Sequence, residues 1–416
     1  MAHFLRGEST TVTNSGNTKR IAFYSQIFRV QKPVLNRKKR RLKAANTIYD
    51  LRVLARKRTP RSAFDYTDGG ADAELSLKRN RQAYEDIEFR PRVLRDVTKI
   101  KLETNMLGKI SALPVGIAPT GFTRMMHSDG ERAGSQAAEA RGIPFTLSTM
   151  GTTSIEEVAR LAPNGRNWFQ LYIWKDRDRS TQLINRAKEA GFDTLVVTVD
   201  AQVAGNRLRD VKNGLTVPPT LTAKSLVDAL PRVSWWWDLL TKEPLEFASL
   251  LSWQGTVAEL MNTMFDPSVT FKDFEWLRNE WHGKLVIKGV QTVEDARLSV
   301  EAGADAVILS NHGGRQLDRA PAPLHLIQET VREIGKDAEV HVDSGIMHGS
   351  DVITAIALGA KFTWVGRAYL YGLMAGGRDG VERSLDILES QMQRTMKLLG
   401  VNSLEELTPD VIKFLK

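Results

Sequence analysis

Beyond Ile87 the chain alternates short apolar runs with longer stretches in which apolar residues recur every three or four positions. The eight runs cover residues 113–119, 144–149, 168–173, 194–200, 285–290, 306–311, 339–346 and 362–369. Strands that are apolar on both faces and separated by helices are typical of a parallel sheet. Eight such units predict a (β/α)8 barrel, also called a TIM barrel. An open doubly wound sheet is disfavoured because no Gly-x-Gly-x-x-Gly follows an early strand.

We predict that the barrel domain occupies residues 47–416. It should begin with a helix that has Thr47 as its N-cap and Ile48, Leu51 and Leu54 on one face. Other helical patterns begin near Ala322 and cover residues 178–190, 292–302 and 350–358. Most of the helical patterns end in glycine, as a helix stop requires.

The chain is strongly basic around the start of this domain. Between Arg29 and Arg61 there are thirteen Lys or Arg residues and one acid, Asp50, so this segment carries +12 in a chain whose net charge is +9. We predict that residues 1–46 form a basic arm with weak order.

The run Arg37–Arg41 within this arm suits an anionic membrane surface or non-specific contact with nucleic acid. This leaves open a second class of function, a binding module that acts through the arm. We expect no specific nucleic-acid partner, because the arm lies outside the barrel and lacks interleaved basic and aromatic residues.

Composition excludes several other kinds of site. The chain contains no cysteine, which excludes disulfide bonds, a thiolate nucleophile and cysteine-ligated metals, and no metal site is predicted. It has no uninterrupted apolar run of about 20 residues and no apolar core of a secretory signal at its start. We therefore expect a cytoplasmic protein, with the inner face of the plasma membrane as a candidate place of peripheral attachment.

A long insertion, residues 201–271, separates the fourth and fifth predicted strands. A connection of this length inside a barrel is usually functional or mobile. It contains three consecutive tryptophans, Trp235 to Trp237, which cannot all face one core from a single helix; further apolar residues are Phe247, Leu250, Leu251 and Trp253. Two hypotheses stay open: contact with a bilayer interface, where indole rings are favoured, and a lid or subunit contact.

Residues that interrupt the apolar pattern, most of them polar, gather where the predicted strands end. In chain order they are Pro119, Thr120, Gly121, Ser148, Gln170, Tyr172, Thr198, Asp200, Lys288, Ser310, His312, Asp343, Ser344, Gly345, Gly366 and Arg367. Barrel enzymes build their active sites at the C-terminal ends of the strands. Polar groups inside apolar strands are costly unless they have partners, and a ligand with many polar edges, such as a flavin, would provide them.

The residues after the sixth predicted strand, Ser310 to Asp318, combine two glycines with His312 and Arg315. Glycines let the backbone turn sharply and approach a ligand. An imidazole can remove a proton near neutral pH, and a guanidinium can bind a carboxylate through two parallel hydrogen bonds. The pair suggests oxidation of, or proton abstraction from, a small carboxylic acid. A solvated His and Arg in an ordinary loop is the alternative.

This nonapeptide, SNHGGRQLD, resembles the signature of the FMN-dependent α-hydroxy acid dehydrogenase and oxidase family, and the resemblance extends from about Ile48 to the C-terminus. Within the family the chain is most similar to quinone-linked L-lactate dehydrogenases of the actinobacterial type. The resemblance implies FMN as cofactor, an (S)-2-hydroxy acid such as L-lactate as substrate, a quinone as electron acceptor and a homotetramer. Glycolate or mandelate as substrate, and oxygen as acceptor, stay open.

The resemblance also assigns roles to residues. His312 would be the base, either for the α-proton with formation of a carbanion or for the hydroxyl proton with hydride passing to the flavin. Asp200 would stabilise its imidazolium, and Lys288 would stabilise the anionic reduced flavin. Arg315, Arg207 and Tyr66 would bind the substrate carboxylate, and Tyr172 would bind the hydroxyl or keto oxygen. The flavin would contact Pro119, Thr120, Gly121, Ser148, Gln170, Thr198, Lys288, Ser310, Asp343, Ser344, Gly345, Gly366 and Arg367.

Two positions depart from the commonest family pattern. Met347 stands where that pattern has an arginine, so phosphate binding is expected to rest on Arg367 and backbone amides. Met150 stands where several oxidases have an aromatic residue. This second position faces the substrate side chain in the family, so its size bears on specificity.

Overall fold

The computed structural model describes residues 35–213, 228, 230–243 and 265–415. The chain divides into two compact units, Met1–Arg40 and Arg41–Lys416. Of the predicted basic arm only the part from Leu35 onward is described, and it contains helix α2 (Arg37–Ala44). Everything that follows concerns the second unit.

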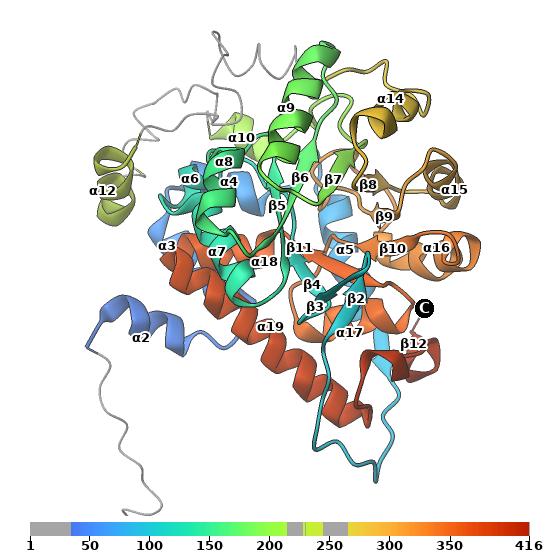
Figure 1. Ribbon diagram of the computed structural model, residues 1–416. Helices are drawn as coiled ribbons and strands as arrows, with labels where there is room; N and C mark the ends of the chain where they lie inside the picture. The colour runs from blue at the N-terminus through green and yellow to red at the C-terminus, as the bar shows by residue number, and fades with distance from the viewer. Residues whose placement is uncertain (1–34, 214–227, 229, 244–264, 416) are drawn as a thin grey trace, which may run out of the picture. The chain divides into compact units, whose positions relative to one another are not determined.

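Eight parallel strands close into a barrel in the order in which they occur along the chain, which confirms the predicted architecture (Figure 1). They are β4 (Val115–Ile117), β5 (Pro144–Ser148), β6 (Arg166–Leu171), β7 (Thr194–Thr198), β8 (Lys284–Val290), β9 (Ala306–Leu309), β10 (Glu339–Val342) and β11 (Phe362–Val365). Pairing of β11 with β4 closes the ring. Because every pair is parallel, the C-terminal ends of all eight strands lie at one rim.

Large side chains fill the inside of the barrel. Trp168 on β6 and Trp364 on β11 are fully buried, with ring centroids 4.7 Å apart. The hairpin of β2 (Thr104–Met106) and β3 (Lys109–Ser111) adds the buried side chains of Met106 and Leu107 to the same cluster. The barrel interior is therefore a packed core, and ligands are expected at the rim.

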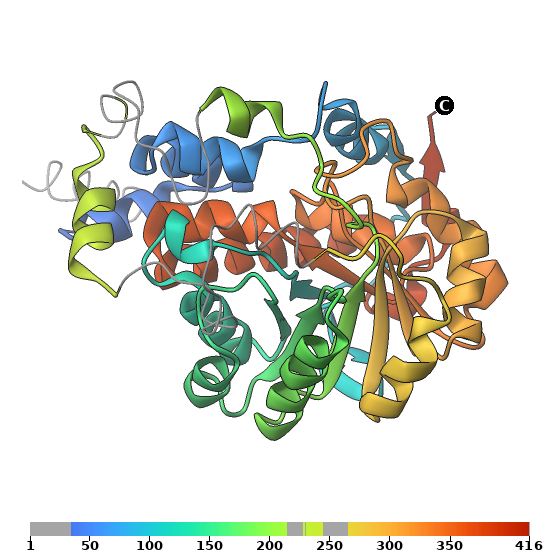
Figure 2. The ribbon, with the colours of Figure 1, turned by 90° about the horizontal axis from the view of Figure 1, so that it is seen from above.

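Helices surround the strands, as the view in Figure 2 shows. Those that follow the strands are α6 (Thr123–Met126), α7 (Gly130–Ala140), α8 (Ile155–Leu161), α9 (Arg177–Glu189), α14 (Asp273–Glu280), α15 (Val293–Glu301), α16 (Ile327–Ile334), α17 (Gly349–Ala357), α18 (Arg367–Gly376) and α19 (Arg378–Leu399). The predicted helices at residues 178–190, 292–302 and 350–358 agree with α9, α15 and α17 to within one or two residues. The helical pattern near Ala322 begins instead as a 3-10 turn, η2 (Pro323–Leu326).

After α2, three further helices of the described chain precede the barrel: α3 (Ile48–Arg58), α4 (Arg61–Asp68) and α5 (Leu75–Glu85). The predicted cap of α3 is confirmed, since Thr47 Oγ1 accepts from Asp50 N and Asp50 accepts from Thr47 N in a capping box. Helix α4 ends at Gly69, followed by Gly70. Sequence patterns did not predict the two-stranded sheet of β1 (Ile87–Phe89) and β12 (Ile412–Phe414).

The insertion is described in part, as α10 (Leu208–Lys212), α12 (Val233–Thr241) and residues 265–271. The three tryptophans of α12 do not all face one core, which confirms the prediction. Trp235 donates from Nε1 to the carbonyl of Met125, whereas Trp237 is 68% exposed. Phe247, Leu250, Leu251 and Trp253 lie outside the described residues. Among the described helices, none combines the length and apolar character that crossing a membrane would require.

Candidate active site

A cavity of about 540 Å³ opens at the rim formed by the C-terminal ends of the strands. Fifteen of the residues selected from the sequence line it: Tyr66, Pro119, Thr120, Gly121, Ser148, Tyr172, Arg207, Lys288, His312, Arg315, Asp343, Ser344, Gly345, Gly366 and Arg367. The other four lie directly behind them. Gln170 contacts Ser148, Asp200 contacts His312, Ser310 contacts Lys288, and Thr198 is paired with Lys288 across β7 and β8.

His312 and Asp200 form a hydrogen-bonded pair. His312 Nδ1 lies 2.9 Å from Asp200 Oδ1, and the Asp200 side chain is 2% exposed. Burial lowers the pKa of His312 and outweighs the opposing effect of Asp200. Burial also opposes ionisation of Asp200, but His312 and Lys288 together hold the pKa of its carboxyl below the usual value. A neutral imidazole beside a carboxylate donates from Nδ1, which leaves Nε2 as the basic atom.

The backbone around His312 is held in an unusual conformation. His312, Gly313 and Gly314 have φ values of +57°, +65° and +74°, the left-handed region that favours glycine. At His312 this conformation is fixed by hydrogen bonds from its N–H to Ser310 Oγ, 3.0 Å, and from its ring to Asp200. A side chain at Gly314 would meet Leu77 N at 2.5 Å. The loop therefore turns sharply against α5 and presents the imidazole to the cavity.

Lys288 is a buried ammonium with its own partners. Its Nζ lies 3.2 Å from Asp343 Oδ2 and donates to Ser310 Oγ at 3.1 Å. Burial opposes the charge, but Asp343 and Asp200 raise the pKa of Lys288 above its ordinary value. Lys288 is therefore a permanent positive charge at the cavity wall.

Two guanidinium groups flank the ring of Tyr66. Arg315 Cζ lies 4.8 Å and Arg207 Cζ 5.8 Å from the ring centroid. Burial, reinforced by the charge of Arg207, lowers the pKa of Arg315 to about 9. Within the described residues, neither arginine forms an ion pair with a carboxylate. Asp210 is a nearby acid but does not reach ion-pair distance of either group, so the two neighbouring cations predict an anion-binding site at this wall.

Tyr172 lies across the same cavity. Its ring packs edge-on against Phe265, with centroids 5.3 Å apart. Burial, followed by the charge of Asp200, raises the pKa of Tyr172. The phenol therefore stays protonated and can donate a hydrogen bond to an oxygen of a bound ligand.

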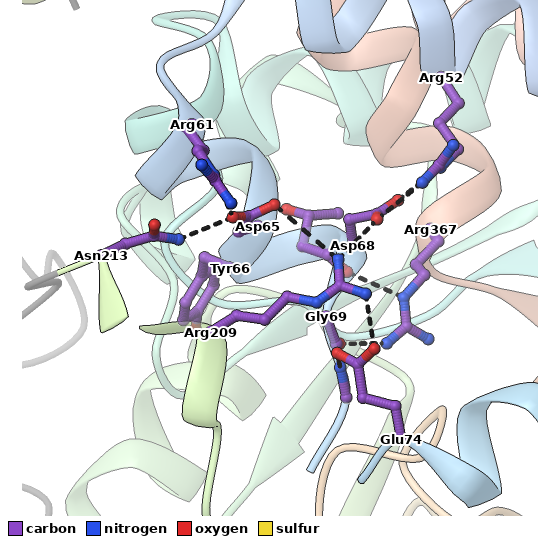
Figure 3. A network of polar contacts seen from close by, with 12 residues as sticks. Arg52, Arg61, Asp65, Tyr66, Asp68, Gly69, Glu74, Arg209, Asn213 and Arg367 are labelled. Atoms are coloured by element: carbon purple, nitrogen blue, oxygen red, sulfur yellow. Dashed lines mark hydrogen bonds and ion pairs between the residues drawn. The ribbon is translucent and has the colours of Figure 1, made fainter. Parts of the chain in front are cut away.

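An ion-pair network fixes the C-terminal end of α4, the helix that carries Tyr66 (Figure 3). Asp68 at its centre accepts from Arg52 Nε at 2.5 Å, from Arg209 Nη1 at 3.1 Å and from the Tyr371 hydroxyl at 2.8 Å. Arg209 also donates to Glu74 Oε2 at 2.5 Å. Helix α4, the start of the insertion and α18 are thereby tied together.

The residues predicted for the phosphate end line the cavity, and the structure adds one cation to them. Arg367 lines the cavity, but its guanidinium donates to the carbonyls of Thr67, Gly69 and Gly313 at 2.7–2.8 Å. Met347 lines the cavity as well. A second cation, Arg81 on α5, lines it near Met347 and donates to the carbonyl of Gly345 at 2.6 Å.

Several buried polar atoms at the rim have no hydrogen-bond partner within the described part of the chain. They include Gln170 Nε2, Thr198 Oγ1 and Arg207 Nε. Gln170 Oε1 accepts from Ser148 Oγ and Thr149 N, which leaves only its amide donor unused. An unpaired buried donor costs about 1–3 kcal/mol, so these atoms fit a ligand with polar edges, as a flavin has. The residues present therefore fit FMN.

Sequence reasoning missed some of the residues that organise the site. Gln316 accepts from Gly205 N at 3.1 Å and donates to the carbonyls of Asp200 and Val203 at 3.0 and 2.9 Å. It thus joins the loop of His312 to the segment that carries Arg207. Its place in the nonapeptide was a signal, but a neutral amide suggested no contact. Arg209, Asp68 and Glu74 gave no signal, because ion pairs between distant segments leave no local pattern.

Comparisons with known proteins agree with this geometry. A family model described as FMN-dependent dehydrogenase matches residues 55–414. A Mycobacterium tuberculosis protein provisionally named L-lactate dehydrogenase is 57% identical over 390 residues, which cover 94% of each chain. An L-lactate dehydrogenase of Vibrio cholerae is 41% identical over 368 residues, covering 87% of this chain and 97% of the relative. The structure of the monotopic membrane protein (S)-mandelate dehydrogenase aligns with a TM-score of 0.86 at 37% identity, covering 89% of this chain and 100% of that one.

The unpartnered Thr198 hydroxyl yields a prediction. Thr198→Val should weaken FMN binding about three- to tenfold, because a hydrogen bond to the ligand is lost, without lowering the unfolding free energy of the apoprotein. The matched control is Thr194→Val at the other end of β7, where the hydroxyl donates to Asp193 at 2.8 Å. It should destabilise the apoprotein by about 1 kcal/mol and leave FMN affinity unchanged. Flavin fluorescence titration and urea unfolding measure both; a destabilised Thr198→Val apoprotein with normal FMN affinity would contradict the assignment.

Proposed function

Because the chain belongs to the family of FMN-dependent dehydrogenases, we propose that it oxidises an (S)-2-hydroxy acid to the 2-keto acid, with L-lactate as substrate and pyruvate as product. FMN is its cofactor, and the reaction class is oxidation of a CH–OH group. The observation that carries the proposal is that one cavity is lined by a base, His312, and an unneutralised pair of guanidinium groups, Arg207 and Arg315.

The carboxylate of the substrate binds between Arg207 and Arg315. A guanidinium offers two parallel donors, which fix the orientation of a carboxylate as well as its position. The Tyr66 ring spaces the two cations, since each lies within 6 Å of its centroid. Tyr172 donates to the hydroxyl oxygen and later to the keto oxygen of the product.

Oxidation of the CH–OH group removes two hydrogens and two electrons from the substrate. His312 takes one hydrogen as a proton, from the α-carbon or from the hydroxyl, and the other hydrogen leaves with the two electrons. Its Nε2 is basic because Nδ1 donates to Asp200, and the imidazolium that forms is stabilised by the same carboxylate. FMN, when bound, accepts the two electrons that the substrate gives up. Lys288, held charged by Asp343, stabilises negative charge on the reduced ring. Contacts with FMN are assigned to the strand-end residues from Pro119 to Arg367 that surround the cavity.

The relatives' names support lactate, and the mandelate dehydrogenase structure supports a larger acid as the second candidate. Met150, Ala201 and Phe265 also line the cavity. A flexible thioether at Met150 and a small side chain at Ala201 leave room beside the reactive groups. The relatives named for L-lactate are 57% and 41% identical and the mandelate dehydrogenase is 37% identical, so we propose lactate as the preferred substrate. The room beside the reactive groups would admit mandelate, which we expect to react more slowly.

A membrane quinone is the proposed electron acceptor, and the insertion is the proposed membrane contact. Helix α12 exposes an apolar face made of Val233, Trp237 and Leu240, which are 71%, 68% and 75% exposed. Arg232 lies at its start and donates to the carbonyl of Lys57, in the basic end of α3. An exposed apolar face beside cations suits peripheral attachment to an anionic bilayer.

The first prediction from the proposed function concerns the reaction. Purified protein should be yellow with FMN, anaerobic L-lactate should bleach it, and a quinone analogue should restore the colour faster than oxygen does. The measurement is rapid-mixing absorbance with lactate, glycolate and (S)-mandelate, each followed by quinone or oxygen. A protein that binds FMN but is not bleached by any of the three acids would refute the proposed function.

The second prediction concerns pH. Bleaching by lactate should slow as His312 takes up a proton, with a midpoint below the ordinary value of 6.5, because burial lowers its pKa. Asp200→Asn removes the group that raises the pKa of His312, so the midpoint should move to still lower pH. The rate at neutral pH should fall by about 10²-fold or more, because the imidazolium loses its anion. A midpoint that rises in Asp200→Asn would contradict this pairing.

The third prediction concerns the membrane. The double variant Trp237→Ser and Leu240→Ser should lose most of its binding to vesicles of anionic lipid, while lactate still bleaches it at the normal rate. The control is Leu398→Ser on α19, which is 71% exposed and far from α12 in sequence. Vesicle sedimentation measures binding. Equal binding by the double variant and the wild type would exclude α12 as the contact.

A further inference from the structure

The carboxylate-binding wall is assembled from three segments that are distant in the sequence. Tyr66 belongs to α4, Arg207 directly precedes α10 in the insertion, and Arg315 follows β9. None of the three side chains is bonded to another by a hydrogen bond between side chains within the described residues. Their relative positions must therefore be fixed by other contacts.

Arg315 is fixed to α4 directly. Its Nη1 donates to the carbonyls of Tyr66 and Gly69. Arg207 has no comparable hydrogen bond to α4 within the described part of the chain: its Nε is buried without a partner, and its guanidinium lies over the face of the Tyr66 ring, 5.8 Å from the centroid. The position of Arg207 therefore depends on how α10 is held.

Arg209 holds the start of α10 against α4, and Asn213 at its other end donates to Asp65 Oδ2 at 2.8 Å. Arg209 Nη1 lies 3.1 Å from Asp68 Oδ2, at the end of α4, and its Nη2 lies 2.5 Å from Glu74 Oε2, in the following turn (Figure 3). Asp65 Oδ1 is 3.8 Å from the same Nη1. Glu74 in turn accepts from Gly70 N at 3.0 Å. The Arg209 guanidinium thus joins the insertion to three acids around the C-terminal end of α4, which carries Tyr66.

The geometry points to Arg209 as a positioning residue for the substrate carboxylate: we propose that its ion pairs with Asp68 and Glu74 keep Arg207 over Tyr66 and opposite Arg315. This inference rests on the proposed function, in which that wall binds the carboxylate. Arg209 itself is 37% exposed and acts through α10. Misplacing one member of a bidentate carboxylate site weakens binding of substrate and transition state alike, so affinity should change more than the limiting rate.

The test compares Arg209→Met with a matched control. Arg297→Met on α15 also removes a guanidinium that bridges two acids, Glu294 and Glu301, and Arg297 is 40% exposed. In Arg209→Met the lactate concentration that gives half-maximal bleaching should rise about tenfold, with a limiting rate within about twofold of the wild type. Arg209→Lys, which keeps one charge, should recover part of the affinity. Arg297→Met should match the wild type in both quantities.

A second readout does not depend on the reaction. Oxalate, a carboxylate without the reactive C–H bond, should perturb the FMN absorbance of the wild type, and its dissociation constant should rise in Arg209→Met by a factor similar to that for lactate. FMN content and the unfolding midpoint identify any variant that fails to fold. In that case Arg209→Lys and Glu74→Gln replace it, because both weaken the tie and keep the positive charge at position 209.

Two results would overturn the proposal. One is wild-type affinity for lactate and oxalate in a folded Arg209→Met protein. The other is an equal loss of affinity in Arg52→Met, which removes the other guanidinium on Asp68 but leaves Arg209 on Glu74; that would show that the charge around Asp68 matters and the tie to α10 does not. A wild type that neither lactate nor another 2-hydroxy acid bleaches would instead refute the proposed function, so the two failures are distinguishable.

Discussion

Closure of eight parallel strands into one ring is the constraint on which the rest of the molecule depends. Parallel pairing throughout places the C-terminal end of every strand at the same rim, and Trp168 and Trp364 fill the space below. Residues as far apart in sequence as Thr120 and Arg367 therefore line one cavity. The filled interior also limits the depth of that cavity, so a planar cofactor has to lie across the strand ends.

Closure of the barrel concentrates positive charge at the rim, and the cations there have different kinds of partner. Lys288 forms an ion pair with Asp343, whereas Arg367 donates to three backbone carbonyls and Arg315 to two. Arg207 and Arg315 have no carboxylate at ion-pair distance within the described residues. A buried charge is costly unless it is paired. The arrangement of charges therefore leaves two guanidinium groups beside His312 that are free of ion pairs within the described residues, as the proposed binding of an anionic substrate requires.

The insertion has two kinds of contact in its described parts. Near the cavity it is tied to the barrel by polar groups: Gln316 binds Asp200 and Val203, and Arg209 binds Asp68 and Glu74. Farther along, α12 exposes tryptophan and leucine. The first part completes the substrate site and the second offers an apolar surface. One segment of chain thus carries both a part of the cavity wall and an exposed apolar surface.

The sequence alone determined the barrel and most of the residues at its rim. Apolar runs separated by helices have few alternative folds, and polar residues at strand ends are recognisable because each is anomalous in its own segment. Thus the eight strands, the cap at Thr47 and seventeen site residues were found from local patterns, and Tyr66 and Arg207 from the resemblance. The structure gathers all nineteen residues at or directly behind one cavity. The roles assigned to them follow from the resemblance and from chemistry.

Only the tertiary structure decided which groups form hydrogen bonds and ion pairs with one another. Arg367 was expected to face phosphate, yet its donors are used by carbonyls of three residues that precede or follow distant strands. Arg209 carried no signal, because its partners Asp68 and Glu74 are more than a hundred residues away in the chain. Periodicity and propensity act over a few residues, whereas ion pairs act through space. The sequence therefore specifies the strands and the chemistry at their ends, and the folded chain specifies their partners.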